Sequence, residues 1–390
     1  MINKSKPLNF ITEYETPQKE FIPNIYDYND FYKFNRYAFD WVFDIIDRKN
    51  YNFVSEVPLE SEEKFFYLIP FGATFAFLDN IFLKNISKKY LDMIRNYNHV
   101  YLVLWNPIER ISPKIEWVHE KINYYLEETG IPKNKLIYVT GDLSTHYCDF
   151  SVRSFMIFDA IQFNNIKKDK DLIIGEKRPI LEHKNYDYVH LIRKSREHRI
   201  KLLYKLFKSK KTSNLYTNFG KKYTENFLND FLNEDYLDQF LDNLEVNKFH
   251  ETNNNPFCIN QEFLTQARFH VVHESIGDKF NFLTEKTFKP IFIKQPFIIN
   301  GSLEVNKSLK NYGYEIFENI FNYDFDYESN PDKRIELLAN ELNNVLERYD
   351  KKEFNKKIIE CNEICEYNYK VLEKRSNPDN VFQRIKNILY

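Results

Sequence analysis

Residues 270–302, HVVHESIGDKFNFLTEKTFKPIFIKQPFIINGS, hold an apolar strand pattern, a polar loop, a helix start and a second apolar strand pattern in succession. Two strands joined by a helix are typical of a parallel sheet with helical crossovers. In such a sheet the strands end at one edge, where ligands bind and helix N-termini lie. The segment therefore predicts an α/β fold that places Glu285 and Lys286 at a ligand-binding edge.

The same alternation of strand and helix patterns runs through most of the chain. Its period predicts strands at 65–71, 100–105, 136–140, 155–161, 188–192, 215–217, 268–273, 297–300 and 314–317. Helices are predicted at 30–48, 80–96, 114–129, 196–208, 225–244, 284–293, 303–312, 333–349 and 356–372. These elements form two α/β halves followed by helices.

A chain of 390 residues is too long for one ordinary hydrophobic core, so we expect two domains. The charged segment 166–187, which Gly175 and Pro179 interrupt, is the best linker candidate. The predicted parts are an N-terminal extension (1–60), an N-terminal Rossmann-like domain (61–180), a C-terminal Rossmann-like domain (181–330) and C-terminal helices (331–390). A substrate cleft between the two domains is the natural site.

Composition and missing motifs exclude several classes of protein. The formal net charge of −2 gives no global attraction to nucleic acid or anionic membranes. The apolar stretch 67–83 is short for a bilayer and contains Pro70 and Asp79, so we expect no membrane span. Four cysteines without a paired spacing do not form a disulfide framework, so we expect a cytoplasmic protein. Neither half has a GxGxxG or GxxxxGK[ST] motif, which argues against a dinucleotide dehydrogenase and a P-loop ATPase. Cys361 and Cys365 are predicted to be buried thiols, with half a metal site as the alternative.

Thr284, Glu285 and Lys286 form the first candidate binding cluster. Thr284 can cap the helix with its hydroxyl, and the helix dipole favours the carboxylate of Glu285 in the first turn. A well-capped surface helix explains these two residues but not Lys286, because a cation is unfavourable at a helix N-terminus. A bound phosphate would reverse that cost, and a carboxylate suits the two hydroxyls of a ribose. We therefore expect a nucleotide site here.

Two further clusters follow strand ends. Glu274 and Ser275 lie where an apolar strand gives way to a loop, with an exposed loop acid as the alternative to a ligand-binding one. The run 193–199, RKSREHR, opens a helix after the strand at 188–192. Arginine binds phosphate oxygens in a bidentate manner, so Arg193, Arg196 and Arg199 are candidates for a diphosphate clamp. A solvated basic face and a groove for single-stranded nucleic acid are the other interpretations.

The stretch from Glu274-Ser275 through FLTEKTF and QPFII to Gly301-Ser302 resembles the donor-binding motif of the alpha-1,3-fucosyltransferases. It more closely resembles glycosyltransferase-like proteins of large DNA viruses and bacteriophages. Segments 131–142, 193–199 and 309–317 are also similar to these proteins, so the resemblance touches about residues 130–320. The asparagine of the fucosyltransferase Glu-Asn-Ser is missing here, and a fucose donor is therefore not supported.

The resemblance implies a GT-B fold, in which two Rossmann-like domains face each other across a cleft. The N-terminal domain (61–180) would then bind the acceptor, and the C-terminal domain (181–330) the nucleotide-sugar. The resemblance implies that Glu285 binds the ribose, that Lys286 and an arginine of 193–199 bind the diphosphate, and that Glu274 lines the donor pocket. It also implies that no metal and no cofactor beyond the nucleotide-sugar are needed. Asp324-Phe325-Asp326 is nominally a D-x-D metal pattern, but its sequence context is that of an acidic loop.

The sequence therefore predicts a metal-independent GT-B glycosyltransferase that moves a sugar to a hydroxyl of a glycan or similar acceptor. For the general base we choose Asp142, which follows the strand at 136–140, with Glu109 second. One alternative is a transferase acting on hydroxymethylated bases in viral DNA. Another is a non-catalytic nucleotide-binding or scaffold protein.

Overall fold

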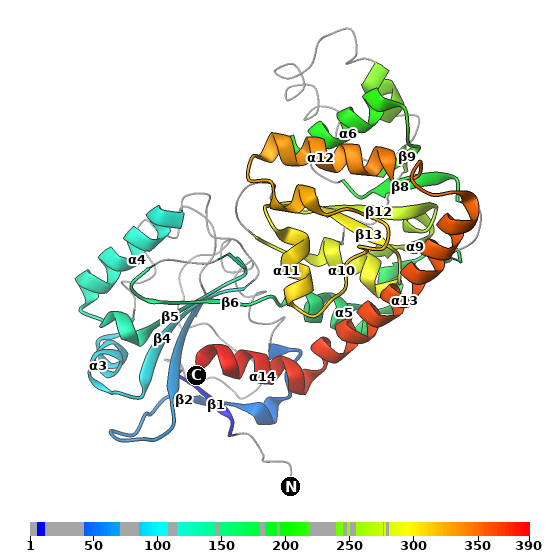
Figure 1. Cartoon of the computed structure of the whole chain (residues 1–390). Coiled ribbons are helices and arrows are strands. Elements are labelled where there is room, and N and C mark those ends of the chain that lie inside the picture. The colour runs from blue at the N-terminus through cyan, green and yellow to red at the C-terminus, as the bar shows by residue number, and fades with distance from the viewer. Residues whose placement is uncertain are drawn as a thin grey trace. The chain divides into compact units, whose positions relative to one another are not determined.

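The computed structural model describes residues 6–11, 43–70, 86–107, 115–144, 148–179, 184–192, 196–217, 239–244, 248–249, 255–275, 277 and 281–390. The chain divides into two compact units. Unit 1 comprises Met1–Ile161 and Arg375–Tyr390, and unit 2 comprises Gln162–Lys374. Each unit has its own parallel sheet with helices beside it, which confirms the predicted α/β class with two Rossmann-like parts (Figure 1).

Unit 1 is built on six parallel strands in the order β2-β1-β3-β4-β5-β6. Their bounds are β1 Leu8–Ile11, β2 Tyr51–Val54, β3 Phe65–Pro70, β4 Val100–Asn106, β5 Leu136–Thr140 and β6 Ser151–Ser154. β1 lies between β2 and β3, with Leu8 opposite Tyr51 and Asn9 opposite Phe65. The range 1–60, predicted as an extension, thus contributes two strands to this sheet.

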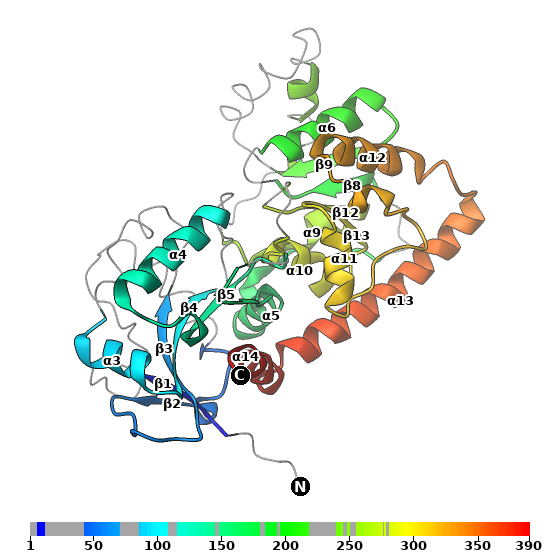
Figure 2. The same cartoon turned by 60° about the vertical axis from the view of Figure 1, so that its left-hand side comes forward.

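Alternating side chains of β3 cover the two faces of the unit 1 sheet. The Tyr67 ring lies 5.8 Å from that of Tyr90 on α3 (Lys88–Asn96). The Phe66 ring lies 5.7 Å from that of Tyr390, which follows α14 (Pro378–Leu389). Successive residues of a strand point to opposite faces, so α3 and α14 lie on opposite sides of the sheet. Figures 1 and 2 show α4 (Ile115–Thr129) on the α3 side.

Unit 2 has five parallel strands in the order β10-β9-β8-β12-β13. Their bounds are β8 Tyr186–His190, β9 Asn214–Thr217, β10 Lys248–Phe249, β12 Ala267–His273 and β13 Phe297–Asn300. From β8 the chain first adds strands on one side and then returns to add β12 and β13 on the other. The strand order therefore reverses between β8 and β12, and an open α/β sheet binds its ligands at such a switch point.

Helices cover both faces of the unit 2 sheet. α6 (Glu197–Ser209) and α12 (Pro331–Asn344) lie side by side on one face, while α10 (Glu285–Phe292), α11 (Val305–Asn311) and α13 (Lys351–Ser376) lie on the other (Figures 1 and 2). The buried Tyr188 hydroxyl donates to the Leu342 carbonyl at 2.8 Å, which ties β8 to α12. Smaller elements are α5 Phe158–Lys168, α9 Gln261–Leu264, the two-stranded sheet of β7 Ile173–Ile174 and β11 Ile259–Asn260, and the 3-10 helices η1 Arg48–Asn50, η3 Lys133–Lys135, η4 Lys170–Leu172 and η5 Asp324–Tyr327.

Two predicted strands are wrong. The range 155–161 leads into helix α5, because a short apolar run does not distinguish a buried helix from a buried strand. The range 314–317 is irregular, and the Phe317 amide donates to the Tyr323 hydroxyl at 3.2 Å instead of to a strand neighbour. The predicted helix at 225–244 is described only at 239–244, where the chain is helical, and 30–48 lies mostly outside the described residues.

Other features of the units bear on the predictions. The compact units meet at 161/162 and 374/375, whereas the predicted domain ranges meet at 180/181. α14 therefore belongs to the same unit as the N-terminal sheet.

All four cysteines are free, and burial raises the pKa of Cys361 to about 12 and that of Cys365 well above its ordinary value. Within the described ranges, no helix is both long and apolar enough to cross a bilayer.

Candidate functional site

The carboxyl ends of β8 and β12 bring most of the predicted donor-binding residues together. β8 is followed by the start of α6, and β12 is followed after a loop by the start of α10. The predicted residues found in mutual contact at this edge are Arg196, Arg199, Glu274, Ser275, Thr284, Glu285 and Lys286. Arg193 lies outside the described residues. The structure thus groups these residues at the switch point of the unit 2 sheet.

Glu274 attaches the N-terminus of α10 to the end of β12. Its side chain is fully buried. Oε1 accepts from the Thr284 amide at 3.0 Å and the Thr287 hydroxyl at 2.6 Å. Oε2 accepts from the Thr284 hydroxyl at 2.8 Å and the Ser275 amide at 3.2 Å. Both oxygens are occupied, so we expect Glu274 to build the site without binding a ligand itself.

The start of α6 holds the same strand end from the other side. The Glu274 carbonyl accepts from Arg199 Nη2 at 2.8 Å and from His198 Nε2 at 3.1 Å. The Ser275 carbonyl accepts from Arg196 Nη1 at 2.5 Å. Arg199 is 2% exposed, whereas Arg196 is half-buried. Arg196 is therefore the better placed of these two arginines to reach a ligand.

Lys286 forms an ion pair with its neighbour Glu285 at the first turn of α10. Its Nζ lies 2.6 Å from Glu285 Oε1 and 3.1 Å from the Thr284 hydroxyl oxygen. The Lys286 and Glu285 side chains are 21% and 13% exposed, so both stay partly accessible. Thr284 accepts a hydrogen bond from the Lys286 amide, which confirms the predicted cap. The pair offers an ammonium and a carboxylate within one helical turn.

The charges at this edge favour an anionic ligand. Burial alone would raise the pKa of Glu285, but the Lys286 ammonium outweighs it, and the pKa is lower than usual. Burial, together with Arg196, lowers the pKa of Arg199 to about 10, so the guanidinium stays charged at neutral pH. The carboxylates of Glu274 and Glu285 stand near the cations Arg196, Arg199, Lys286 and Lys289, and Arg334 donates to the Gly277 carbonyl.

A chain of buried polar side chains stiffens the sheet below this edge. Asn214 Oδ1 lies 2.9 Å from His190 Nε2, and His190 Nδ1 lies 2.9 Å from His273 Nε2. His273 Nδ1 lies 3.0 Å from Asn300 Nδ2. Burial lowers the pKa of His190 to about 4 and that of His273 well below its ordinary value, so both rings are neutral at pH 7. Each neutral ring then donates once and accepts once along the four strands.

The two candidate bases belong to unit 1. Asp142 is fully buried just after β5, and its Oδ1 accepts from the Ser144 amide at 2.9 Å. In this conformation it stabilises the turn after β5 and does not reach solvent. Glu109 lies outside the described residues. The general base therefore stays a prediction.

The acidic segment Asp324-Phe325-Asp326 forms the 3-10 helix η5. Asp326 is 1% exposed and accepts from the Asn306 amide at 3.2 Å and the Lys307 amide at 3.0 Å, so it caps the start of α11. Asp324 accepts from Asn322 Nδ2 at 2.8 Å. The part of the chain that the structure describes contains no group of three or more His, Cys, Asp or Glu residues that could hold a metal.

Several residues of this edge were not singled out from the sequence. They are Thr287, His198, Asn300 and Arg334, whose Nη2 donates to the Gly277 carbonyl at 2.7 Å. Thr287 could have been found, because it lies three residues after Thr284 on the same helix face. His198 lies within the predicted run 193–199, whereas Asn300 and Arg334 come from other segments that only the folded chain brings to this edge.

No protein-family model matches the chain, and no curated protein matches its sequence. The solved structures to which the chain is similar at low identity include the following three. A DNA-modifying beta-glucosyltransferase is 10% identical with a TM-score of 0.39, over 98% of this chain and 99% of that chain. An alpha1,3-fucosyltransferase is 13% identical with a TM-score of 0.40, over 96% and 92%. The N-terminal domain of Candida albicans trehalose-6-phosphate phosphatase is 10% identical with a TM-score of 0.39, over 85% and 72%. Likeness at this level assigns neither substrate nor activity.

Proposed function

We propose that the chain is a nucleotide-sugar-dependent glycosyltransferase of the GT-B type, with its donor site at the switch-point edge of unit 2. The observation that carries the proposal is the Glu285–Lys286 pair, which is 2.6 Å apart and partly accessible at the first turn of α10. A nucleoside diphosphate offers a diol and an anion, and the pair offers the complementary carboxylate and ammonium. Glu274 holds this turn in place through both of its oxygens.

Each charged side chain of the donor site has a role in the proposed reaction. Lys286 and the half-buried Arg196 neutralise the charge that develops on the leaving diphosphate, and this stabilises the transition state. Glu285 is ionised because Lys286 lowers its pKa, so it accepts hydrogen bonds from the ribose hydroxyls. No metal is assigned a role. A carboxylate of unit 1, Asp142 or Glu109, deprotonates the acceptor hydroxyl if the reaction inverts, and Asp142 must first become accessible.

The release of nucleoside diphosphate tests this proposal. The full chain is incubated with UDP- and GDP-sugars, with and without glycan acceptors or DNA containing hydroxymethylated bases. We expect wild type to release the diphosphate from at least one donor and Glu285→Ala to release it about 10- to 100-fold more slowly, since hydrogen bonds to a charged group contribute about 1.5–3 kcal/mol. Chromatography of the nucleotides measures the rate.

A matched control is Lys211→Ala, since Lys211 precedes β9 and so lies at the opposite edge of the sheet, ion-paired to Glu347 at 3.6 Å. This variant is expected to keep the wild-type rate. Stimulation by the modified DNA alone would identify a DNA base as the acceptor. Donor binding without release under every condition would indicate a non-catalytic nucleotide-binding protein and would contradict the proposal.

A further inference from the structure

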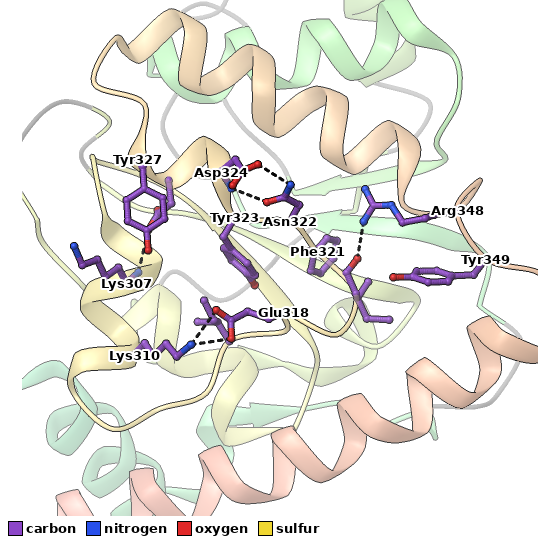
Figure 3. A pocket seen from close by; sticks show the side chains of 13 residues that line it. Lys307, Lys310, Glu318, Phe321, Asn322, Tyr323, Asp324, Tyr327, Arg348 and Tyr349 are labelled. Carbon is purple, nitrogen blue, oxygen red and sulfur yellow. Dashed lines mark hydrogen bonds and ion pairs between the residues drawn. The ribbon is translucent and has the colours of Figure 1, made fainter.

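A pocket of about 440 Å³ opens on unit 2 (Figure 3). None of the residues that line it belongs to the predicted donor site. Its volume falls within the roughly 300–1,000 Å³ that small-molecule sites typically have. Figure 3 shows Lys307 and Tyr327 at one end, Arg348 and Tyr349 at the other, and Phe321, Asn322, Tyr323 and Asp324 between them. The segment around η5 thus forms the middle of the pocket.

The charges of this pocket are balanced. Each of its three cations is paired with a carboxylate: Lys307 with Glu304 at 2.7 Å, Lys310 with Glu318 at 2.8 Å, and Arg348 with Glu341 at 2.7 Å. A phosphate would have to break these pairs and would also meet the lining carboxylates of Asp324 and Glu318. A divalent cation would be repelled by the three cationic side chains. The pocket therefore favours an uncharged ligand with many hydrogen-bonding groups.

Asp324 and Asn322 present such hydrogen-bonding groups. Asp324 Oδ2 accepts from Asn322 Nδ2 at 2.8 Å, while Asn322 Oδ1 accepts from the Asp324 amide at 2.9 Å. This reciprocal pair orients both side chains, which are exposed. Among the described residues, no cation is ion-paired with Asp324. Its carboxylate keeps lone pairs that can accept from two neighbouring hydroxyls.

Tyr327 supplies an apolar surface beside these groups. Tyr327 is 58% exposed, and the Lys307 ammonium lies 5.4 Å from its ring centre. The face of an aromatic ring carries partial negative charge, so the C–H groups of a pyranose can pack against it. Asp324 is three residues before Tyr327 on the same short helix, which places the two side chains near each other.

We propose that this pocket binds an uncharged carbohydrate, with one pyranose packed on Tyr327 and its hydroxyls bonded to Asp324 and Asn322. The residues that line this pocket differ from those of the donor site, and the proposal goes beyond the transfer reaction. A saccharide held here would anchor the chain to a glycan whether or not that glycan is the acceptor. The proposed carbohydrate contacts do not involve Glu285 or Lys286, so saccharide binding can be measured independently of donor binding.

Saturation-transfer NMR of the full chain tests the site with methyl glucoside, methyl galactoside, N-acetylglucosamine and maltose as probes. We expect signal from at least one of them, and binding about tenfold weaker in Tyr327→Ala and in Asp324→Asn, because each removes one principal contact. Tyr367→Ala is the matched control, since Tyr367 is 45% exposed on α13 and does not line the pocket. It should bind as wild type does.

Other outcomes would overturn the inference. These are no signal from any probe, unchanged binding in both pocket variants, or binding that Lys286→Ala removes while Tyr327→Ala leaves it intact. If wild type binds inorganic phosphate or UDP and Tyr327→Ala does not, the pocket selects anions instead. Both pocket side chains are exposed, so thermal melting of the variants should match wild type and confirm that they fold. Loss of nucleotide-sugar turnover in Glu285→Ala leaves this test unaffected.

Discussion

Replacing Glu274 by alanine is expected to lower the free energy of unfolding of unit 2 by about 3–5 kcal/mol. Four donors converge on this fully buried carboxylate, from Ser275, Thr284 (amide and hydroxyl) and Thr287. Alanine would leave these donors buried without an acceptor. It would also leave a cavity between the end of β12 and the start of α10.

Urea unfolding followed by circular dichroism measures this effect. Glu274→Gln keeps the shape of the side chain, but its amide nitrogen cannot accept from Thr284 or Thr287, so it should also destabilise the fold substantially. Glu285→Ala is the control, because the Glu285 side chain is partly exposed and pairs with the neighbouring Lys286. A loss below about 1 kcal/mol in Glu274→Ala would show that the carboxylate does not hold the two elements together.

Replacing Asp159 by alanine is expected to cost unit 1 about 3 kcal/mol at pH 7. Asp159 is fully buried in α5, and its Oδ2 lies 2.7 Å from Arg375 Nε and 3.2 Å from Arg384 Nη1. Arg384 also donates to the Met156 carbonyl. The carboxylate thus attaches α14 and the end of α13 to α5. Removing it leaves two largely buried guanidinium groups without their shared partner.

The same contact gives a defined pH dependence. Burial alone would raise the pKa of Asp159, but Arg384 and Arg375 outweigh it, and the pKa falls below its ordinary 3.8. A carboxyl whose folded pKa is lowered contributes its stability above the unfolded pKa and loses it as the pH falls through the folded pKa. The difference in unfolding free energy between wild type and Asp159→Asn should therefore be constant near neutral pH and shrink below about pH 3.8.

Denaturant unfolding between pH 7 and pH 3 checks this expectation. Asp379→Asn, an exposed first-turn acid of α14, is the control and should stay within about 1 kcal/mol of wild type. A difference between wild type and Asp159→Asn that grows toward low pH would contradict the assigned direction of the pKa shift. Equal stability of the two proteins at pH 7 would contradict the ion pair itself.

The fold class followed from periodicity because long apolar strands and amphipathic helices encode it locally. The strands at 136–140 and 297–300 have the predicted bounds. β1 and β2 were missed because an asparagine interrupts each of these short strands, Asn9 in β1 and Asn52 in β2, and only the pairing of β2 with β1 and of β1 with β3 places them in the sheet. α5 was predicted as a strand because its first turn, FDAI, continues the apolar run that starts at Phe155.

The candidate site was predicted in part. Thr284, Glu285 and Lys286 follow from capping and the helix dipole, which act within a few residues. The partners of the Glu274 carbonyl, His198 and Arg199, lie about 75 residues away and depend on the pairing of β8 with β12. From the sequence, a bound phosphate was predicted to offset the unfavourable charge of Lys286 at the helix N-terminus. In the structure Glu285 also offsets this charge through its ion pair with Lys286.

The most direct test of the donor site is calorimetric titration of the full chain with UDP, GDP and their sugar conjugates. One of these ligands should bind wild type and the Lys211→Ala control equally. It should bind Lys286→Ala about 10- to 150-fold more weakly, because a charge-assisted bond to phosphate contributes about 1.5–3 kcal/mol. Equal affinity of Lys286→Ala and wild type would contradict the assignment of the donor site to the switch-point edge.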